Sequence, residues 1–302
     1  MGDSRLGSAC AVAAGITFGT LGIFSSLFYD EGGDEFSLLV LRVCGMFLIL
    51  AGVVLARSRP APATADAALS VLLGAATLGA TACLLAGFDA ASPGLVVLLF
   101  YIYPLVVTLA AHFLFREELT RRRVLLLVVG MTGIALTVGI PDAATAEGIA
   151  WGLGAGACIS IYILGSRHVM SRSVDSFQFV ALSSGGALLA LAPFVVATGV
   201  SVPAGDGVAY AACVVVISSV VPTLFFYFAV RRVGASSASR LATVEPVTAV
   251  VLSYVVLGDA IVASQIAGGV LVVGAVVALL TPAATRRRAG ASGPACTPRS
   301  TS

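Results

Sequence analysis

The sequence predicts an all-α membrane protein of ten transmembrane helices, arranged as two inverted five-helix repeats. Three observations lead to this fold class: the composition, the long apolar runs, and the similarity between the two halves of the chain. Of the 302 residues, 59% are hydrophobic and only 11% are charged, and the mean hydropathy is +1.05. Soluble domains carry about 25% charged residues. The composition therefore excludes a soluble protein.

The polar residues exclude several kinds of site. All 17 basic residues are Arg, so the chain can hold neither a Schiff-base cofactor nor the Lys of the common nucleotide-binding loop. Only two His occur, His112 and His168, and the 6 Cys show no C-x-x-C spacing. We therefore expect no transition-metal site, no cofactor and no nucleic-acid partner.

Ten apolar stretches are long enough to cross a membrane as helices, which takes about 20 residues each. Backbone groups in lipid must be bonded internally, and runs of this length without two-residue alternation exclude a β-barrel. The predicted spans are residues 7–29, 36–56, 66–88, 94–115, 121–140, 147–168, 176–198, 206–229, 235–257 and 262–281. The segment 282–302 has no apolar period and is predicted to be a disordered cytoplasmic tail.

The Arg residues predict the orientation. If the N-terminus is cytoplasmic, every Arg outside the spans lies in an inner loop or tail, and the outer loops carry acidic residues such as Asp34 and Glu147. Basic residues in short loops stay in the cytoplasm. We therefore expect both termini to be cytoplasmic. The abundance of Arg, Ala, Gly and Val without Lys is typical of a GC-rich bacterium, which would place the protein in the plasma membrane.

The second half of the chain repeats features of the first. Small, Pro and acidic residues fall opposite one another when the halves are aligned. The pairs are Gly15 with Gly156, Gly45 with Gly186, Pro104 with Pro246, and Glu117 with Asp259. An odd number of spans in each half makes the second copy cross the membrane in the opposite sense. We therefore expect inverted repeats over residues 1–142 and 143–281.

Two matching motifs lie in the fourth and ninth spans. The first reads LFYIYP over 99–104 and then FREELT over 115–120, and the second reads ATVEP over 242–246 and then LGD over 257–259. These motifs resemble those of the drug/metabolite transporter superfamily, specifically its ten-helix EamA-type members, over residues 7–281. The resemblance implies the two-repeat architecture and does not identify a substrate. Arg116 stands where that family usually has Gly.

Three ionisable residues lie inside predicted spans: Arg42, Arg240 and Glu245. A charge at the bilayer centre costs about 2.5–3.5 kcal/mol, so each needs water or a partner. Glu245, near mid-membrane, is expected either to exchange protons in a cavity or to pair with an Arg. Arg42 is expected to meet Glu245 or an anionic substrate group, or to be structural. Arg240 is expected to snorkel to the cytoplasmic surface or form a salt bridge, with a role in the substrate path as the alternative.

Pro and Tyr residues supply further candidates for a substrate path. Pro104 and Pro246 lie in mid-span and each removes a backbone donor, so we expect either a local opening toward a polar cavity or a packing kink. Tyr101 lies close to Pro104 and is expected to reach the cavity or to pack. Tyr227 has the same two alternatives.

Hydroxyl and small residues have two interpretations each. Thr17, Thr20 and Ser160 are expected either to line a path or to bond to their own helix turn. Gly residues at small-xxx-small spacing are expected to let helices pack closely within the monomer, with a homodimer interface as the alternative. These are Gly15 and Gly19 in the first span, and Gly152 and Gly156 in the sixth.

Together these features favour a secondary transporter that moves a small metabolite, amino-acid-like or drug-like solute across the plasma membrane by alternating access, as an exporter. The alternatives are a non-transporting membrane sensor or assembly protein and a membrane-embedded enzyme, which would need a dense catalytic cluster. The expected partners are a small-molecule substrate and the lipid bilayer. Proton coupling through Glu245, exchange and facilitated diffusion all stay open, as do the monomer and the homodimer.

Overall fold

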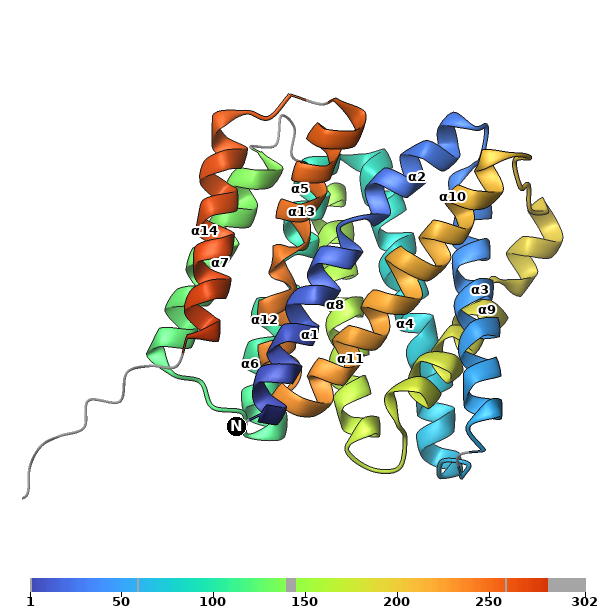
Figure 1. Ribbon diagram of the computed structural model, residues 1–302, viewed down its shortest axis with the longest axis horizontal. Coiled ribbons are helices and arrows are strands. Elements are labelled where there is room, and N and C mark those ends of the chain that lie inside the picture. Colours follow the sequence, from blue (N-terminus) through green and yellow to red (C-terminus); the bar gives the residue numbers. More distant parts are fainter. Residues whose placement is uncertain (1, 59, 140–144, 259, 282–302) are drawn as a thin grey trace, which may run out of the picture.

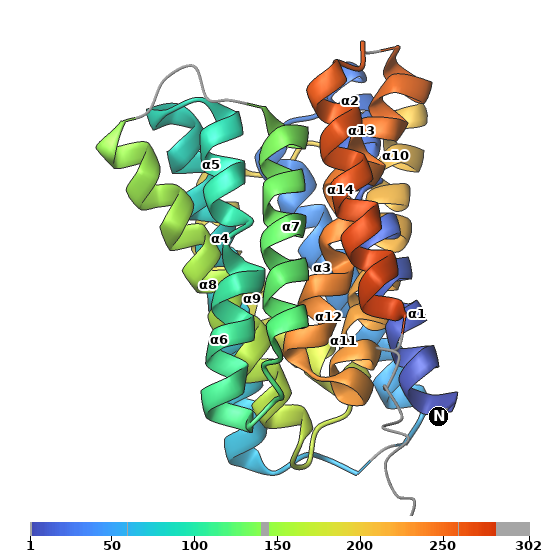
Figure 2. The ribbon, with the colours of Figure 1, turned by 90° about the vertical axis from the view of Figure 1, so that its left-hand side faces the viewer.

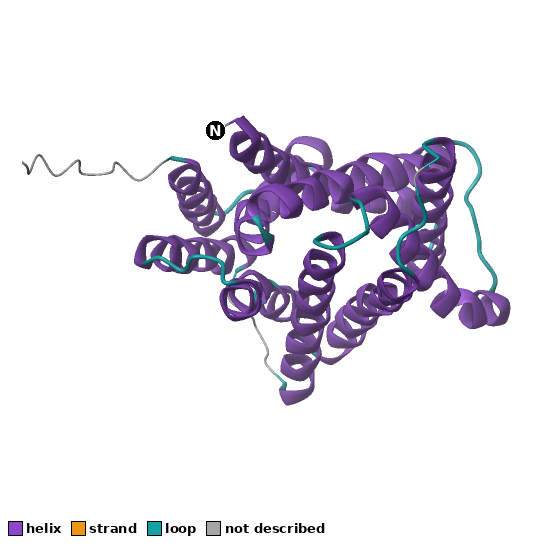
Figure 3. Cartoon of the chain, turned by 90° about the horizontal axis from the view of Figure 1, so that it is seen from below, coloured by secondary structure: helices purple, strands orange, loops and turns teal. Residues whose placement is uncertain are grey.

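The computed structural model describes residues 2–58, 60–139, 145–258 and 260–281. Every secondary-structure element in these residues is helical (Figure 3). The fold class expected from composition is therefore confirmed. Asp259 and the predicted disordered tail 282–302 lie outside the described residues.

Helices follow one another with short connections. The first half contains α1 (Gly2–Phe18), α2 (Leu21–Asp30), α3 (Glu35–Ala56), α4 (Thr64–Ala90), α5 (Pro93–Phe100), α6 (Tyr103–Phe115) and α7 (Arg121–Val138). The second half contains α8 (Ala146–Met170), α9 (Ser176–Thr198), α10 (Asp206–Val215), η1 (Val216–Val220), α11 (Val221–Val233), α12 (Ala235–Leu241), η2 (Ala242–Val244), α13 (Glu245–Leu252), η3 (Ser253–Leu257) and α14 (Ala263–Leu280).

Nine helical segments of the described residues are long and apolar enough to cross a membrane. Some spans are built from helices joined end to end, so that α5 and α6 together form the span Pro93–Phe115. These nine segments correspond to nine of the ten predicted spans. The tenth, α7, begins with Arg121, Arg122 and Arg123, so its composition alone does not mark it as a span. It lies beside α14 (Figure 2).

The two halves run in opposite directions through the molecule. α1 begins at the end where α14 finishes (Figure 1). α8, the first helix of the second half, begins at the other end, where the Thr145 hydroxyl donates a hydrogen bond of 2.7 Å to the Ala90 carbonyl at the end of α4. The first helices of the two halves are therefore antiparallel, as expected for inverted repeats.

The two ends of the bundle differ in charge. The end that holds the N-terminus (Figure 1), here called the Arg-rich end, is where α3, α8 and α11 finish and α7 begins, and the helix bounds place Arg57, Arg123, Arg167, Arg172 and Arg232 there. The opposite end, here called the acidic end, is where α2 finishes and α3, α8 and α10 begin, and it carries Asp30, Asp34, Glu147 and Asp206. Large apolar side chains such as Val128 and Leu189, near the middle of α7 and α9, are exposed between these ends. An apolar outer surface is what a lipid environment requires.

Local capping fixes several helix starts. Asp34 accepts the Ser37 N–H at 2.8 Å at the start of α3, and Thr145 accepts the Gly148 N–H at 3.0 Å at the start of α8. Asp175 and Gln178 form a capping box at the start of α9. Because the first N–H groups of a helix have no partner within it, such short-range signals position the helix ends.

Candidate functional site

The spans that contain Pro104 and Pro246 are both interrupted near their middle. In the first half α5 ends at Phe100 and α6 begins at Tyr103. In the second half the 3-10 turn η2 separates α12 from α13, which begins at Glu245. Each Pro takes the second position of the helix that follows the break, where its missing N–H is not needed. The sequence therefore starts a new helix at matched places in the two halves.

Each break packs against the first helix of the opposite half. A Cβ atom added to Gly15 of α1 would lie 2.6 Å from the carbonyl oxygen of Ala242. A Cβ atom added to Gly156 of α8 would lie 3.1 Å from the carbonyl oxygen of Phe100. Because Pro104 and Pro246 have no N–H, these carbonyls lack the usual donor four residues further on, and the Ala242 carbonyl accepts the Glu245 N–H within the 3-10 turn instead. The expectation that the Gly residues serve close packing inside the monomer is confirmed at both positions.

A cavity of about 370 Å³ lies beside the two breaks and is lined by both halves of the chain. Its charged residues are Arg42 of α3 and Glu245 of α13. The uncharged polar residues that line it are Thr77, Thr81, Tyr103, Tyr162, Ser183, Ser184, Thr223 and Tyr227. Apolar side chains such as Phe18, Met46 and Ile159 form the rest of the wall. A mostly apolar wall with a few convergent polar groups is typical of small-molecule sites.

The cavity lies near the middle of the bundle. On α3, which begins at the acidic end, it is lined by residues 39–46, in the first half of the helix. On α4, which finishes at the acidic end, it is lined by residues 77–84, past the helix midpoint. On α8, which begins at the acidic end, it is lined by residues 159–163, past the helix midpoint, and in the span Asp206–Val233 by residues 223–227, again past the midpoint. The lining residues of the two halves thus lie on either side of mid-depth, so the cavity is central.

Arg42 and Glu245 belong to different halves and share this cavity. They are near enough to interact electrostatically. However, no guanidinium nitrogen of Arg42 lies within 4.0 Å of a carboxylate oxygen of Glu245, so the two do not form an ion pair. The hydroxyl of Tyr101, the residue at the end of α5, lies beside the Glu245 carboxylate in position to donate a hydrogen bond. The structure thus brings two of the predicted residues, Arg42 and Tyr101, to the carboxylate of a third, Glu245.

Aromatic side chains line the cavity on the second-half side. The Tyr227 ring packs edge-on against Tyr162, with centroids 5.7 Å apart, and against Phe179 at 5.0 Å. The Tyr162 hydroxyl and the Ser183 hydroxyl are 2.9 Å apart. Tyr227 therefore both packs and lines the cavity, so the two interpretations of this residue are compatible.

Comparison with known proteins identifies the family. Residues 5–139 and 146–281 each match the EamA-like transporter family. The chain belongs to this family. A protein of Archaeoglobus fulgidus described as an uncharacterized transporter is 26% identical over 277 residues, which covers 90% of this chain and 96% of that protein. A protein crystal structure superposes with a TM-score of 0.73 at 19% identity, covering 90% of this chain and 96% of its own, and so shares the fold.

This EamA-like protein is therefore a multi-pass membrane protein of a transporter family. The family model matches once in each half of the chain. The resemblance of the two motifs to the drug/metabolite transporter superfamily is confirmed. The family implies a small-molecule substrate and a lipid environment.

Three predicted hydroxyl residues lie away from the cavity of this EamA-like transporter. Thr17 donates a hydrogen bond to the Ala13 carbonyl at 2.7 Å, and Ser160 donates to the Gly156 carbonyl at 2.6 Å. Thr20 bonds to the Thr17 carbonyl at 2.7 Å and to Ser218 at 2.7 Å. None of the three lines the cavity. The expectation that they bond within their own helix turn is correct, because a helical carbonyl lies within reach of each hydroxyl.

Arg240 of the EamA-like chain does not snorkel. Its side chain is only 3% exposed and donates hydrogen bonds to Thr108 at 3.2 Å, to Ser237 at 3.3 Å and to Ser236. Hydroxyl groups of α6 and α12 thus hold the guanidinium inside the bundle. The expectation of an outward-reaching side chain is wrong for this residue, and so is that of a salt bridge, since no carboxylate of the described residues lies within 4.0 Å.

Glu117 was not among the predicted site residues, although it joins the two halves. Its carboxylate accepts the backbone N–H of Ala235 at 3.0 Å and of Ser236 at 3.2 Å. Gly234, at φ +85°, precedes the capped helix α12 and leaves no room for a side chain beside this carboxylate. The alignment of the two halves, which places Glu117 opposite Asp259, was the sequence feature that could have identified Glu117 as important. No comparable sequence feature marks Tyr162 and Ser183 as cavity residues.

Proposed function

We propose that this protein is a secondary transporter that carries a small solute through the cavity shared by its two halves, by alternating access. The observation that carries the proposal is that Arg42 and Glu245, from opposite repeats, line one cavity without forming an ion pair. In inverted-repeat transporters the substrate site lies at the repeat interface, where discontinuous helices meet. The cavity beside the breaks before Pro104 and Pro246 has this position.

The substrate class is a small zwitterion with an apolar part, such as an amino-acid-like solute. An ammonium group would bind Glu245, a carboxylate would bind the Arg42 guanidinium, and the apolar part would contact the wall formed by Phe18, Met46 and Ile159. Separate placement of the two charges favours a ligand that bridges them. The volume of about 370 Å³ suits a molecule of amino-acid size.

Named residues have separate roles in this mechanism. Glu245 exchanges a proton during the cycle, because a buried carboxylate is far less stable charged when no cation pairs with it. Tyr101 orients the carboxylate. Pro104 and Pro246 keep the breaks open, and Arg240 ties α12 to α6 at the Arg-rich end.

The orientation follows from the Arg residues. With the Arg-rich end in the cytoplasm, as basic loops require, both termini are cytoplasmic and the cavity lies near the middle of the plasma membrane. We propose export as the direction, in which the cavity receives the substrate from the cytoplasm and releases it outward. Residues 1–142 and 143–281 act as the two units that rock against each other.

Transport assays with purified protein in proteoliposomes test the proposal. Wild-type protein should move a labelled amino acid from a mixed pool, with a rate that depends on pH. Glu245→Gln should remove the pH dependence, whereas Glu147→Gln, which changes an exposed carboxylate at the acidic end, should preserve it. Full pH dependence in Glu245→Gln would mean that protons are not coupled through this residue. Absence of transport for every amino acid in the pool would reject the substrate class.

A further inference from the structure

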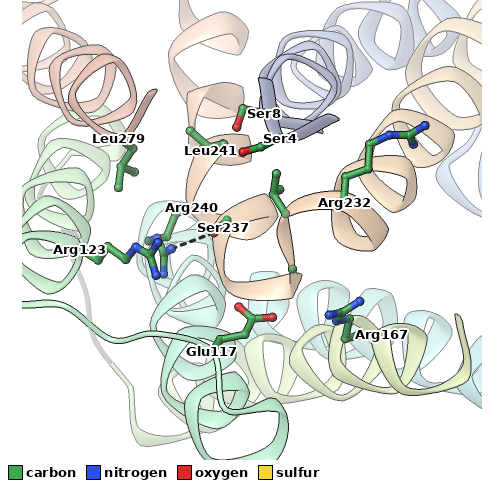
Figure 4. A pocket seen from close by; sticks show the side chains of 12 residues that line it. Ser4, Ser8, Glu117, Arg123, Arg167, Arg232, Ser237, Arg240, Leu241 and Leu279 are labelled. Carbon is green, nitrogen blue, oxygen red and sulfur yellow. Dashed lines mark hydrogen bonds between the residues drawn. The ribbon is translucent and has the colours of Figure 1, made fainter. Parts of the chain in front are cut away.

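A second cavity, of about 410 Å³, lies at the Arg-rich end (Figure 4). Four Arg side chains from four helices line it: Arg123 of α7, Arg167 of α8, Arg232 of α11 and Arg240 of α12. The hydroxyls of Ser4, Ser8 and Ser237 and the carboxylate of Glu117 complete its polar lining. This composition differs from that of the cavity between the halves, which is mostly apolar.

Two of the four guanidinium groups have acidic partners at the rim. Arg123 lies 3.8 Å from Glu118, whose side chain is 80% exposed. Arg232 lies 3.3 Å from Asp3, whose side chain is 88% exposed. Ion pairs this exposed are weak, because water screens both charges. They leave Arg123 and Arg232 available to another anion.

The other two guanidinium groups have no carboxylate within 4.0 Å in the part of the chain that the structure describes. Arg167 lies over the Phe115 ring, with 6.0 Å between the guanidinium carbon and the ring centroid. Arg240 donates only to hydroxyl groups. Glu117 is the acid that faces the cavity, and both of its oxygens accept backbone N–H groups of α12. The four guanidinium groups therefore carry more positive charge than the three described carboxylates beside them, Glu117, Glu118 and Asp3, can balance.

Two buried donors have no acceptor among the described residues. The Nε atoms of Arg167 and Arg240 are buried without a hydrogen-bond partner there, and Arg240 as a whole is only 3% exposed. Buried polar groups are normally hydrogen-bonded, since an unpaired donor loses its water without compensation. In addition, Arg123 and Arg240 extend side by side into the cavity (Figure 4), where their like charges repel.

We propose that this cavity binds a phosphate-type oxyanion through Arg240, Arg123 and Arg167. Guanidinium groups match the oxygens of phosphate in geometry and charge, and an anion between Arg123 and Arg240 would remove their repulsion. The Ser4 and Ser8 hydroxyls supply further donors. The volume exceeds that of a bare phosphate ion, so an organic group also fits. This site is separate from the proposed transport cavity and does not depend on it.

The phosphate group has two possible sources, which the experiment separates. It belongs either to a soluble ion or phosphomonoester or to the headgroup of an anionic lipid, since Leu279 at the end of α14 forms part of the wall. The first measurement is thermal unfolding of the purified full chain in an uncharged detergent, with inorganic phosphate titrated against chloride at equal ionic strength. Ligand binding to the folded state raises the Tm.

The variants are Arg240→Gln and Arg123→Gln, with Arg121→Gln as the matched control. Arg121 is an exposed residue in the first turn of the same helix as Arg123 and does not line the cavity. Wild-type protein and Arg121→Gln should gain about 3 °C at saturating phosphate, and the other two variants should gain less than a third of that. Arg123→Gln keeps the test valid if removal of the buried Arg240 prevents folding.

The second measurement uses nanodiscs in phosphate-free buffer, made of phosphatidylcholine with or without phosphatidylglycerol. A Tm increase that needs phosphatidylglycerol and is lost in Arg123→Gln, without any effect of free phosphate, assigns the site to a lipid headgroup. The proposal is overturned if neither ligand stabilises the wild type. It is equally overturned if Arg121→Gln reduces the increase as much as Arg123→Gln does.

Discussion

Gly15 of α1 packs directly against the carbonyl oxygen of Ala242, at the helix break of the opposite half. The matched pair, Gly156 and Phe100, repeats this contact with the halves exchanged. The backbone can approach so closely only because neither Gly has a Cβ atom. The two broken spans are thus held by the first helix of the other repeat, at the depth where Glu245 enters the cavity.

Gly15→Ala should therefore destabilise the protein. The added methyl group would lie 2.6 Å from both the Ala242 oxygen and a methyl carbon of Val244, and overpacking of this kind costs about 1–3 kcal/mol. Gly22→Ala is the control, because nothing lies within 4 Å of the added atom. Thermal unfolding in detergent measures both. Equal Tm values for the two variants would show that the contact is not tight.

Arg42→Gln should impair transport selectively. A substrate carboxylate bound to Arg42 would lose a charge-assisted hydrogen bond worth about 1.5–3 kcal/mol, which corresponds to a fall of about 10- to 100-fold in kcat/KM. Amines without a carboxylate should be transported as before. Arg57→Gln is the control, since Arg57 lies outside the cavity with its guanidinium 4.1 Å from the Phe177 ring centre. A uniform loss for acids and amines would contradict substrate binding by Arg42.

Glu117→Ala should weaken the connection between the halves. Removal of the carboxylate leaves the N–H groups of Ala235 and Ser236 without their acceptor, and loss of a helix cap costs about 0.5–2 kcal/mol. Glu118→Ala, at a side chain that is 80% exposed, should change stability by less than about 0.5 kcal/mol. The difference in Tm between the two variants is the measurement, and no difference would mean that the cap does not stabilise the fold.

Asp34, outside the spans, should make stability depend on acidity. Hydrogen bonds from the hydroxyl and backbone N–H of Ser37 hold the pKa of its carboxyl below the usual 3.8. Because the folded-state pKa is lowered, the ionised carboxylate stabilises the fold above pH 3.8 and this contribution disappears as the pH falls through the lowered value. The stability difference between wild type and Asp34→Asn should accordingly be constant from pH 7 to 5 and shrink toward pH 3. A difference independent of pH would contradict the assignment.

Much of the architecture could be predicted from the sequence. The predicted spans 176–198 and 235–257 coincide with the observed segments Ser176–Thr198 and Ala235–Leu257. Apolar length, Pro and capping residues act over a few neighbouring positions, so they can be identified along the chain. The helix breaks before Pro104 and Pro246 are also marked by such a local signal, the Pro residue itself.

The inward faces of the helices were harder to predict. A helix in lipid is apolar on the outside as well, so it lacks the polar face that marks the orientation of a helix in a soluble protein. This is why Thr17, Thr20 and Ser160 were candidates beside Arg42 and Glu245. It also explains why Tyr162 and Ser183, which line the cavity, were not identified.

The order of apolar runs, the position of every Arg and the repeated Pro and Gly residues determined, without coordinates, that this chain is a helical membrane protein of two opposed halves. The tertiary structure decided which side chains meet. It placed Arg42 near Glu245 and enclosed Arg240 among hydroxyl groups. It also placed the Glu117 carboxylate against the start of α12, in the other half. These contacts join residues far apart in sequence, and their energies depend on how helices are rotated and how closely they approach, which local sequence signals do not specify.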